Sequence, residues 1–171
     1  MPLTQQFARV TPTYLERCRA SALDSPDAGP DWEPPDSDTL DADWALWGLL
    51  RYSRDRLGDV ALTALLDRVT SGDPGGDVGF LDHPEVCDGF SDPPRLLSPA
   101  AVAHLSRALG GVDLDGALGG LPATVSEAAS VCGFGGFTGD VRAYLARHFT
   151  ATRAFFRVAA QQGMCVVVRT D

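Results

Sequence analysis

The feature that most constrains the fold is a short apolar run near the C-terminus. Residues 164–168 read Met-Cys-Val-Val-Val, which is typical of a β-strand. A lone strand is not stable, so this one must pair with others in a sheet. Residues 7–10 are the best partner and a candidate edge strand, and residues 78–81 or 95–97 are expected to join them.

Helical patterns fill much of the remaining chain. Thr11-Pro12 and Ser98-Pro99 each place an N-cap residue before a proline that suits the first helical position. Apolar spacing predicts helices over about 12–23, 40–55, 60–70, 99–110 and 140–162, with one or two short helices within 112–139. The expected fold is therefore α+β, in one domain spanning residues 1–171. About five or six helices would pack on a small mixed or antiparallel sheet that includes the N-terminal and C-terminal strands.

Two long segments carry neither pattern. Residues 25–38 contain four prolines and five acidic residues, and residues 71–94 are rich in Gly, Asp and Pro. Trp32, in the middle of the first segment, is expected to pin that loop to the core. Loops as long as 71–94 are uncommon in compact domains and are often functional.

Charge narrows the classes of partner. The net charge is −9, the 14 basic residues are all Arg, and no basic cluster occurs. Nucleic acid and anionic membranes both need clustered positive charge, so neither is an expected partner, whereas a basic protein is compatible. The chain has no apolar run long enough to span a membrane and no secretory signal at its start, so we expect it in the cytoplasm.

Few residues have the spacing of a chemical site. The four cysteines are far apart, so we expect reduced, mostly buried thiols and neither a metal nor a cofactor. Asp82, His83 and Cys87 form the densest group of ligand types. They would supply a metal site or a Cys–His nucleophilic pair, but no second ligand pair is visible and a structural role is favoured. His148 lies in the apolar stripe of the last helix, which favours a hydrogen-bonded core histidine over a ligand.

The three tryptophans leave two alternatives. Trp32, Trp44 and Trp47 would line an aromatic pocket for a small ligand, or two of them would fill the core. Core packing is the favoured interpretation.

Several segments together resemble a known family. Phe7-Ala8-Arg9-Val10 precedes a capped helix, Leu40-Asp41-Ala42-Asp43 opens an aromatic-rich helix, and Arg95-Leu96-Leu97-Ser98-Pro99 opens another helix. With the long last helix, Gln162-Gly163 and the terminal strand, this pattern is similar to the YfbM-like family, a bacterial family of unknown function.

The resemblance implies a compact α+β domain with no established activity or cofactor. Members often continue the Leu-Asp-x-Asp start with Lys-Ala-Trp-His-Gly-Leu-His. Here residues 44–50 read Trp-Ala-Leu-Trp-Gly-Leu-Leu. Gly48 and Leu49 match, whereas the lysine and both histidines do not. A family site built on those histidines would therefore lack them in this chain.

Two functions remain. The first is a non-catalytic interaction or accessory protein, for example an immunity-like protein that neutralises a partner. The alternative is a small hydrolase or ligand-binding protein that uses the loop 71–94 and an aromatic pocket. We assign no catalytic residue and expect any binding to involve Trp32, Trp44, Trp47, Asp82, His83, Cys87 or His148.

Overall fold

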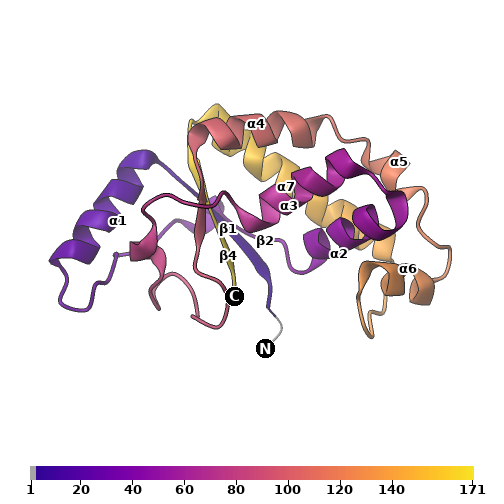
Figure 1. Cartoon of the computed structure of the whole chain (residues 1–171), viewed down its shortest axis with the longest axis horizontal. Helices are drawn as coiled ribbons and strands as arrows, with labels where there is room; N and C mark the ends of the chain where they lie inside the picture. The colour runs from indigo at the N-terminus through magenta and orange to yellow at the C-terminus, as the bar shows by residue number, and fades with distance from the viewer. Residues whose placement is uncertain (1–2) are drawn as a thin grey trace.

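The computed structural model describes residues 3–171 and has a four-stranded antiparallel sheet at its centre (Figure 1). The strand order is β2-β1-β4-β3, with bounds β1 (Gln5–Val10), β2 (Thr39–Asp41), β3 (Arg95–Leu97) and β4 (Cys165–Thr170). The predicted α+β class, with both terminal strands in one small sheet, is confirmed. The prediction that residues 7–10 form an edge strand is wrong, because β2 pairs with the side of β1 that β4 leaves open.

Seven α-helices surround the sheet. They are α1 (Pro12–Asp24), α2 (Ala45–Tyr52), α3 (Val60–Ser71), α4 (Pro99–Gly110), α5 (Leu114–Leu118), α6 (Val125–Cys132) and α7 (Val141–Gln161). The predicted caps are present: the side chains of Thr11, Ser98 and Asp140 accept backbone N–H bonds at the starts of α1, α4 and α7. The number exceeds five or six because residues 112–139 form two short helices.

The predicted helix over 40–55 is wrong at its start. Leu40 and Asp41 belong to β2, and a turn separates them from α2. In that turn Asp41 Oδ1 accepts the Asp43 N–H at 2.7 Å, and Asp43 takes a left-handed conformation with φ of 51°. Asp tolerates this conformation better than most residues, which explains how the chain leaves the strand without glycine. Residues 78–81 are also not a strand, since Gly79–Leu81 forms a 3₁₀ turn.

One face of the sheet carries the larger core. Phe7, Leu97, Val166 and Val168 point to this face and pack against α2 through α7. The Phe7 ring meets the Phe156 ring of α7 edge to face, with centroids 5.8 Å apart. The C-terminal strand and the longest helix therefore anchor the same core.

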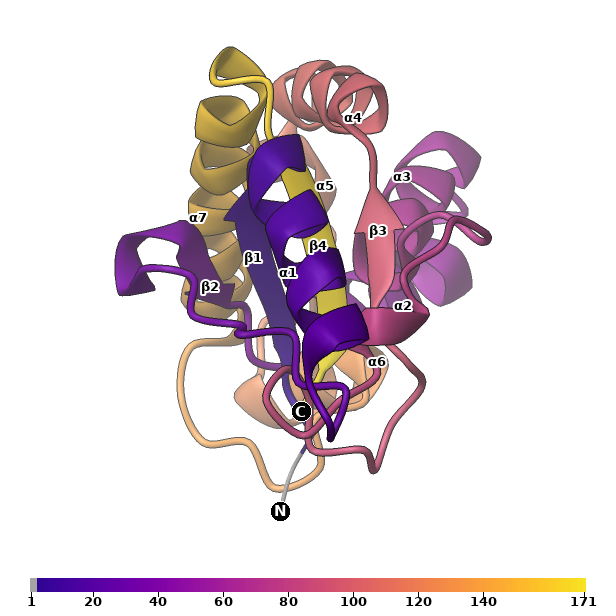
Figure 2. The same ribbon diagram turned by 90° about the vertical axis from the view of Figure 1, so that its left-hand side faces the viewer.

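The opposite face carries a smaller core. Ala8, Val10, Cys165 and Val167 point to it, and Figure 2 shows α1 lying across β1 and β4 on this side. The rest of the cover comes from the two long loops, which insert Trp32, Leu81 and Val86. The expectation that Trp32 pins its loop to the core is confirmed, because only 7% of the residue is exposed.

A close approach between α2 and the loop after α6 fixes Gly48. A Cβ atom built on Gly48 would lie 2.0 Å from Cζ of Phe134, a residue that is itself buried. Helix α2 can therefore pack here only because this position has no side chain.

We expect Gly48→Ala to lower the free energy of unfolding by about 1–3 kcal/mol, the usual cost of overpacking, although alanine favours helix. Chemical denaturation measures the effect. Gly110→Ala is the matched control, because Gly110 ends α4 with open space around it and should be neutral or slightly stabilising. In a Phe134→Ala background the Gly48→Ala cost should disappear; an undiminished cost there would contradict the steric explanation.

Candidate functional site

The two long loops meet on the outer face of the smaller core. The backbone N–H of Trp32 donates to Glu85 Oε2 at 3.3 Å, and His83 Nε2 lies 3.2 Å from the Asp27 carbonyl oxygen. Cys87 is buried beneath this junction, whereas Asp82 is exposed. Trp32, Asp82, His83 and Cys87 are thus part of one loop junction.

His83 and Cys87 do not face each other as a base and a nucleophile. His83 Nδ1 accepts the Glu85 N–H at 3.2 Å, so Nε2 carries the proton that is donated to Asp27, and both ring nitrogens are engaged. Cys87 Sγ instead lies 4.0 Å from the Leu81 carbonyl oxygen. Burial raises the pKa of the Cys87 thiol, which keeps it protonated and weakly nucleophilic.

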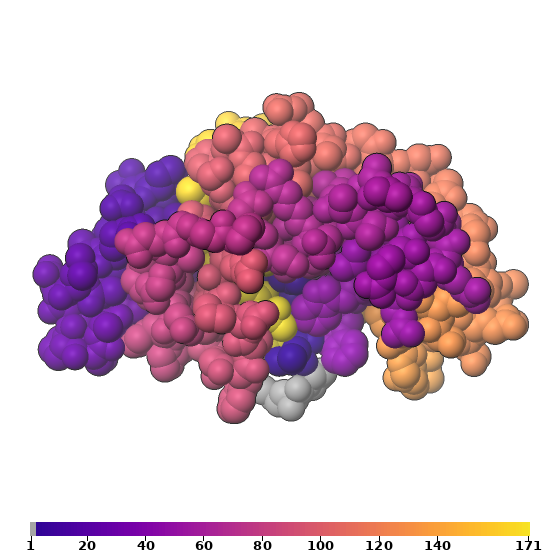
Figure 3. Space-filling model, in the orientation of Figure 1, coloured from indigo at the N-terminus to yellow at the C-terminus, as the bar shows by residue number. Residues whose placement is uncertain are grey.

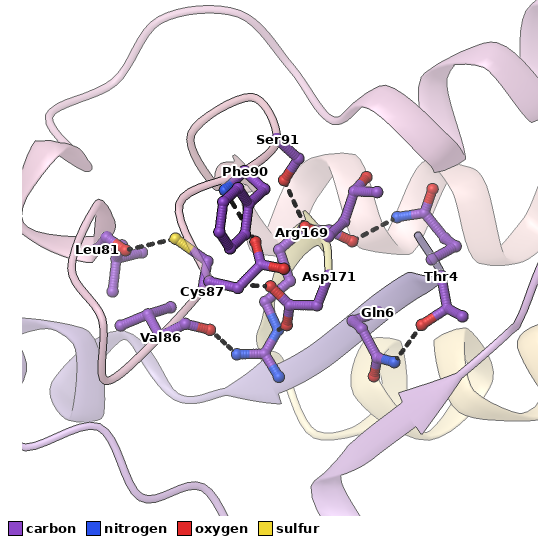
Figure 4. Close-up of polar contacts among 12 residues, drawn as sticks. Thr4, Gln6, Leu81, Val86, Cys87, Phe90, Ser91, Arg169 and Asp171 are labelled. Carbon is purple, nitrogen blue, oxygen red and sulfur yellow. Dashed lines mark hydrogen bonds and ion pairs between the residues drawn. The ribbon is translucent and has the colours of Figure 1, made fainter. Parts of the chain in front are cut away.

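A polar clamp holds loop 71–94 to the end of β4 (Figure 4). The Arg169 guanidinium donates to the Val86 carbonyl and forms an ion pair with Asp171 at 3.1 Å. Asp171 Oδ1 accepts the Asp88 N–H at 3.2 Å, and the Ser91 hydroxyl donates to the Thr170 carbonyl. These bonds fix the loop at several points, so the residues that follow Ser91 have a defined place beside the sheet.

The other predicted residues gather at the far side of the molecule, along α2 and α7. The rings of Trp47 and Trp44 meet edge to face with centroids 6.4 Å apart. The backbone N–H of Trp44 donates to the Tyr144 hydroxyl at 3.2 Å, and the Tyr144 and His148 ring centroids are 4.8 Å apart. We call these four residues the aromatic row. Trp32 does not join it, because it lies on the opposite face of the sheet. The favoured core interpretation is wrong for Trp44, of which 38% is exposed, and Trp47 is half-buried.

Burial shifts the pKa values of two side chains in the aromatic row, His148 and Tyr144. It lowers the pKa of His148, and the neighbouring Arg147 guanidinium lowers it further, against the opposing Asp43 and Asp41 carboxylates. Burial also raises the pKa of Tyr144, as does the Asp43 carboxylate beside it. Both rings are therefore neutral at pH 7, and they act as hydrogen-bonding surfaces rather than as charges.

Trp47 also forms one wall of a cleft of about 270 Å³. The floor is β4, and the remaining walls come from the end of α3, loop 71–94 and β3, around the yellow atoms near the middle of Figure 3. The cleft is lined by Trp47, Thr70, Ser71, Asp92, Pro93, Arg95, Val168, Arg169 and Thr170. It is therefore the place where one of the predicted tryptophans meets the predicted functional loop.

Sequence reasoning missed several members of these groups. Tyr144 and Asp43 were not among the residues predicted for a site. Asp92 carried no motif, and Arg95 was noted only as the first residue of a candidate strand and of a segment in the family resemblance. The left-handed turn at Asp41–Asp43 is the one feature with a local signal, since an Asp-x-Asp pair favours such turns.

Neither a metal-binding cluster nor a membrane-spanning helix is found in the part of the chain that the structure describes. Among residues 3–171, no three His, Cys, Asp or Glu side chains gather closely enough to hold a metal ion. Within the same residues, no helix combines the length and apolar character that crossing a membrane requires.

The fold is of the α+β class, with one antiparallel sheet covered by helices, and a solved structure shares it. The arrangement is similar to the crystal structure of YfbM, a protein of unknown function from Escherichia coli, with a TM-score of 0.56 and 12% identity. The match covers 96% of this chain and 98% of that one. No protein-family model and no curated protein sequence matches the chain. The resemblance to the YfbM-like family is thus confirmed as a likeness of fold.

The thiols give a first test of the site. All four cysteines are free and buried, as predicted, and burial raises the pKa of each, that of Cys132 to about 11. We expect a thiol reagent such as DTNB to react roughly a hundredfold or more slowly with the native protein at pH 7.5 than with the denatured protein. One thiol that reacts rapidly in the native protein and disappears in Cys87→Ala would contradict the structural role of Cys87.

His148 gives a second test through pH. Its pKa in the folded state lies below the unfolded value, so the unfolded chain binds more protons and stability falls as the pH drops below the unfolded pKa of about 6.5. Denaturant unfolding of the parent protein and of His148→Gln at pH 7.5 and 5.5 should show a smaller loss in the variant. His104→Gln, at an exposed position on α4, is the control and should follow the parent. Equal losses in all three proteins would refute the assignment.

Proposed function

We propose that this chain is a non-catalytic binding protein that docks on a basic protein surface. The observation that carries the proposal is the distribution of charge. Residues 24–43 and 71–94 contain fourteen of the 23 acidic residues and none of the 14 arginines. We call these two segments together the acidic lobe.

The two segments are neighbours in space as well as in composition. They touch where Glu85 meets the Trp32 N–H and where His83 meets the Asp27 carbonyl. In Figure 3 the indigo and pink atoms form one continuous end of the molecule. The carboxylates around this junction therefore add up over one surface, which steers a positively charged partner towards it, whereas Asp41 and Asp43 lie beside the aromatic row.

Most of this charge is not compensated within the chain. Arginines from outside the lobe pair with Asp38, Asp73 and Asp77. The other eleven acidic side chains of the lobe have no ion pair within 4.0 Å in residues 3–171. A surface that keeps so many unpaired like charges gains by meeting the opposite charge on a partner.

Two exposed apolar side chains supply anchors for such a partner. Leu23, at the end of α1 beside the lobe, is 80% exposed, and Phe90, within loop 71–94, is 85% exposed. Large apolar residues within a charged rim are typical of interface hot spots. An immunity-like protein that neutralises a basic toxin would have this combination. The alternative of a small hydrolase has less support, because both ring nitrogens of His83 are engaged with the backbone.

We expect affinity purification with quantitative mass spectrometry to recover a basic protein at moderate salt and to lose it as salt rises. The triple variant Asp24→Asn, Asp36→Asn and Asp82→Asn should recover less of it, since these exposed carboxylates form no ion pair. Phe90→Ala should also weaken recovery, by roughly tenfold in affinity.

The matched control removes the same charge elsewhere, by Asp67→Asn, Asp115→Asn and Glu127→Gln, at exposed helical positions outside the lobe that form no ion pair in residues 3–171. This control should keep the partner. Equal recovery by both triple variants, or no specific protein with the parent chain, would count against the proposal.

A further inference from the structure

The cleft beside Trp47, one wall of which comes from loop 71–94, has the features of a ligand site. Its volume of about 270 Å³ is just below the usual range of small-ligand pockets, which suits a single small ring. We propose that this cleft binds a neutral polyhydroxylated ring of monosaccharide size.

The aromatic wall is the first argument. Trp47 lines the cleft and is half-buried, and its edge-to-face contact with Trp44 holds its orientation. A fixed indole presents a broad apolar surface at little cost in side-chain entropy, which suits the C–H face of a sugar ring.

The polar lining is the second argument. Asp92 and Arg95 bring one negative and one positive charge, and neither forms an ion pair within 4.0 Å in residues 3–171. A balanced pair favours neither an anion nor a cation. Both side chains instead form hydrogen bonds to hydroxyl groups, with Asp92 accepting and Arg95 donating. Hydroxyls of Thr70, Ser71 and Thr170 add further polar partners along the same lining.

A buried hydrogen bond that supports the floor is the third argument. Gln5 lies opposite Thr170 in the β1–β4 register, so the two side chains share one face of the sheet. Gln5 is fully buried, and its Nε2 donates to the Arg169 carbonyl at 3.0 Å. Its Oε1 has no hydrogen-bond partner in residues 3–171. Gln5 does not line the cleft, so it holds the floor strand in place and does not itself contact a ligand.

The clamp keeps the cleft open in its present shape. Ser91 donates to the Thr170 carbonyl, which places Asp92 and Pro93 directly beside the floor. The wall contributed by loop 71–94 is therefore formed before any ligand arrives, and binding pays little for ordering it.

The test uses the intact chain and methyl glycosides of glucose, galactose and mannose, with inorganic phosphate, putrescine and adenine as comparison probes. Saturation-transfer NMR and tryptophan fluorescence should detect at least one glycoside, with a Kd of about 1 mM, because small ligands with few apolar atoms bind weakly. Trp47→Leu should weaken that binding by roughly tenfold, and Asp92→Asn and Arg95→Gln by several-fold each.

Val60→Ala is the control, because it trims an exposed apolar side chain that does not line the cleft and should leave glycoside binding unchanged. Circular dichroism and the thermal midpoint verify that each variant is folded. If Trp47→Leu is unfolded, the Asp92 and Arg95 variants decide the outcome. The proposal is overturned if no glycoside binds at about 10 mM, or if phosphate, putrescine or adenine binds more tightly than every glycoside. Unchanged binding in the folded cleft variants would overturn it as well.

Discussion

The structure depends on the burial of β4 from both sides. Val166, Val167 and Val168 are 0%, 0% and 4% exposed, although successive side chains of a strand point to opposite faces. A strand that is apolar on both faces requires two layers of cover. Helices α2 to α7 provide one layer, but only α1 remains for the other, and a single helix is too narrow to cover a four-stranded face alone. The two acidic loops complete the second layer.

This use of loops as cover explains how charge and core coexist in the same segments. Trp32, Leu81 and Val86 point inward, while the carboxylates between them remain in water. Each of these buried side chains anchors an irregular loop to the sheet. The Arg169 clamp adds a hydrogen bond and an ion pair at the C-terminal end of β4. The acidic lobe is thus a structural layer whose outer surface is available for a partner, so its charges are held in place rather than spread over a mobile chain.

The parts of the fold predicted from the sequence are those with local causes. The caps at Thr11, Ser98 and Asp140, and the apolar run of β4, each depend on a few neighbouring residues. Strand β2 was missed because it is only three residues long and exists through pairing with β1. The cleft was also out of reach, because Trp47, Asp92 and Arg95 come together only when α2, loop 71–94 and β3 pack around β4. The separation of Trp32 from Trp47 has the same origin, since sequence spacing does not reveal which face of a sheet a loop will cover.

The likeness to YfbM concerns the backbone, and function depends on what side chains this backbone presents. Gly48 is required by the backbone, because the Phe134 ring occupies the space of a Cβ atom. Trp44 and Trp47 flank that position, and no such steric requirement selects them. They lie where the resemblance implied a lysine and a histidine, which replaces a basic, titratable surface with an apolar one. The packing of α2 therefore constrains residue 48 to glycine, while the side chains beside it determine what surface the same backbone presents.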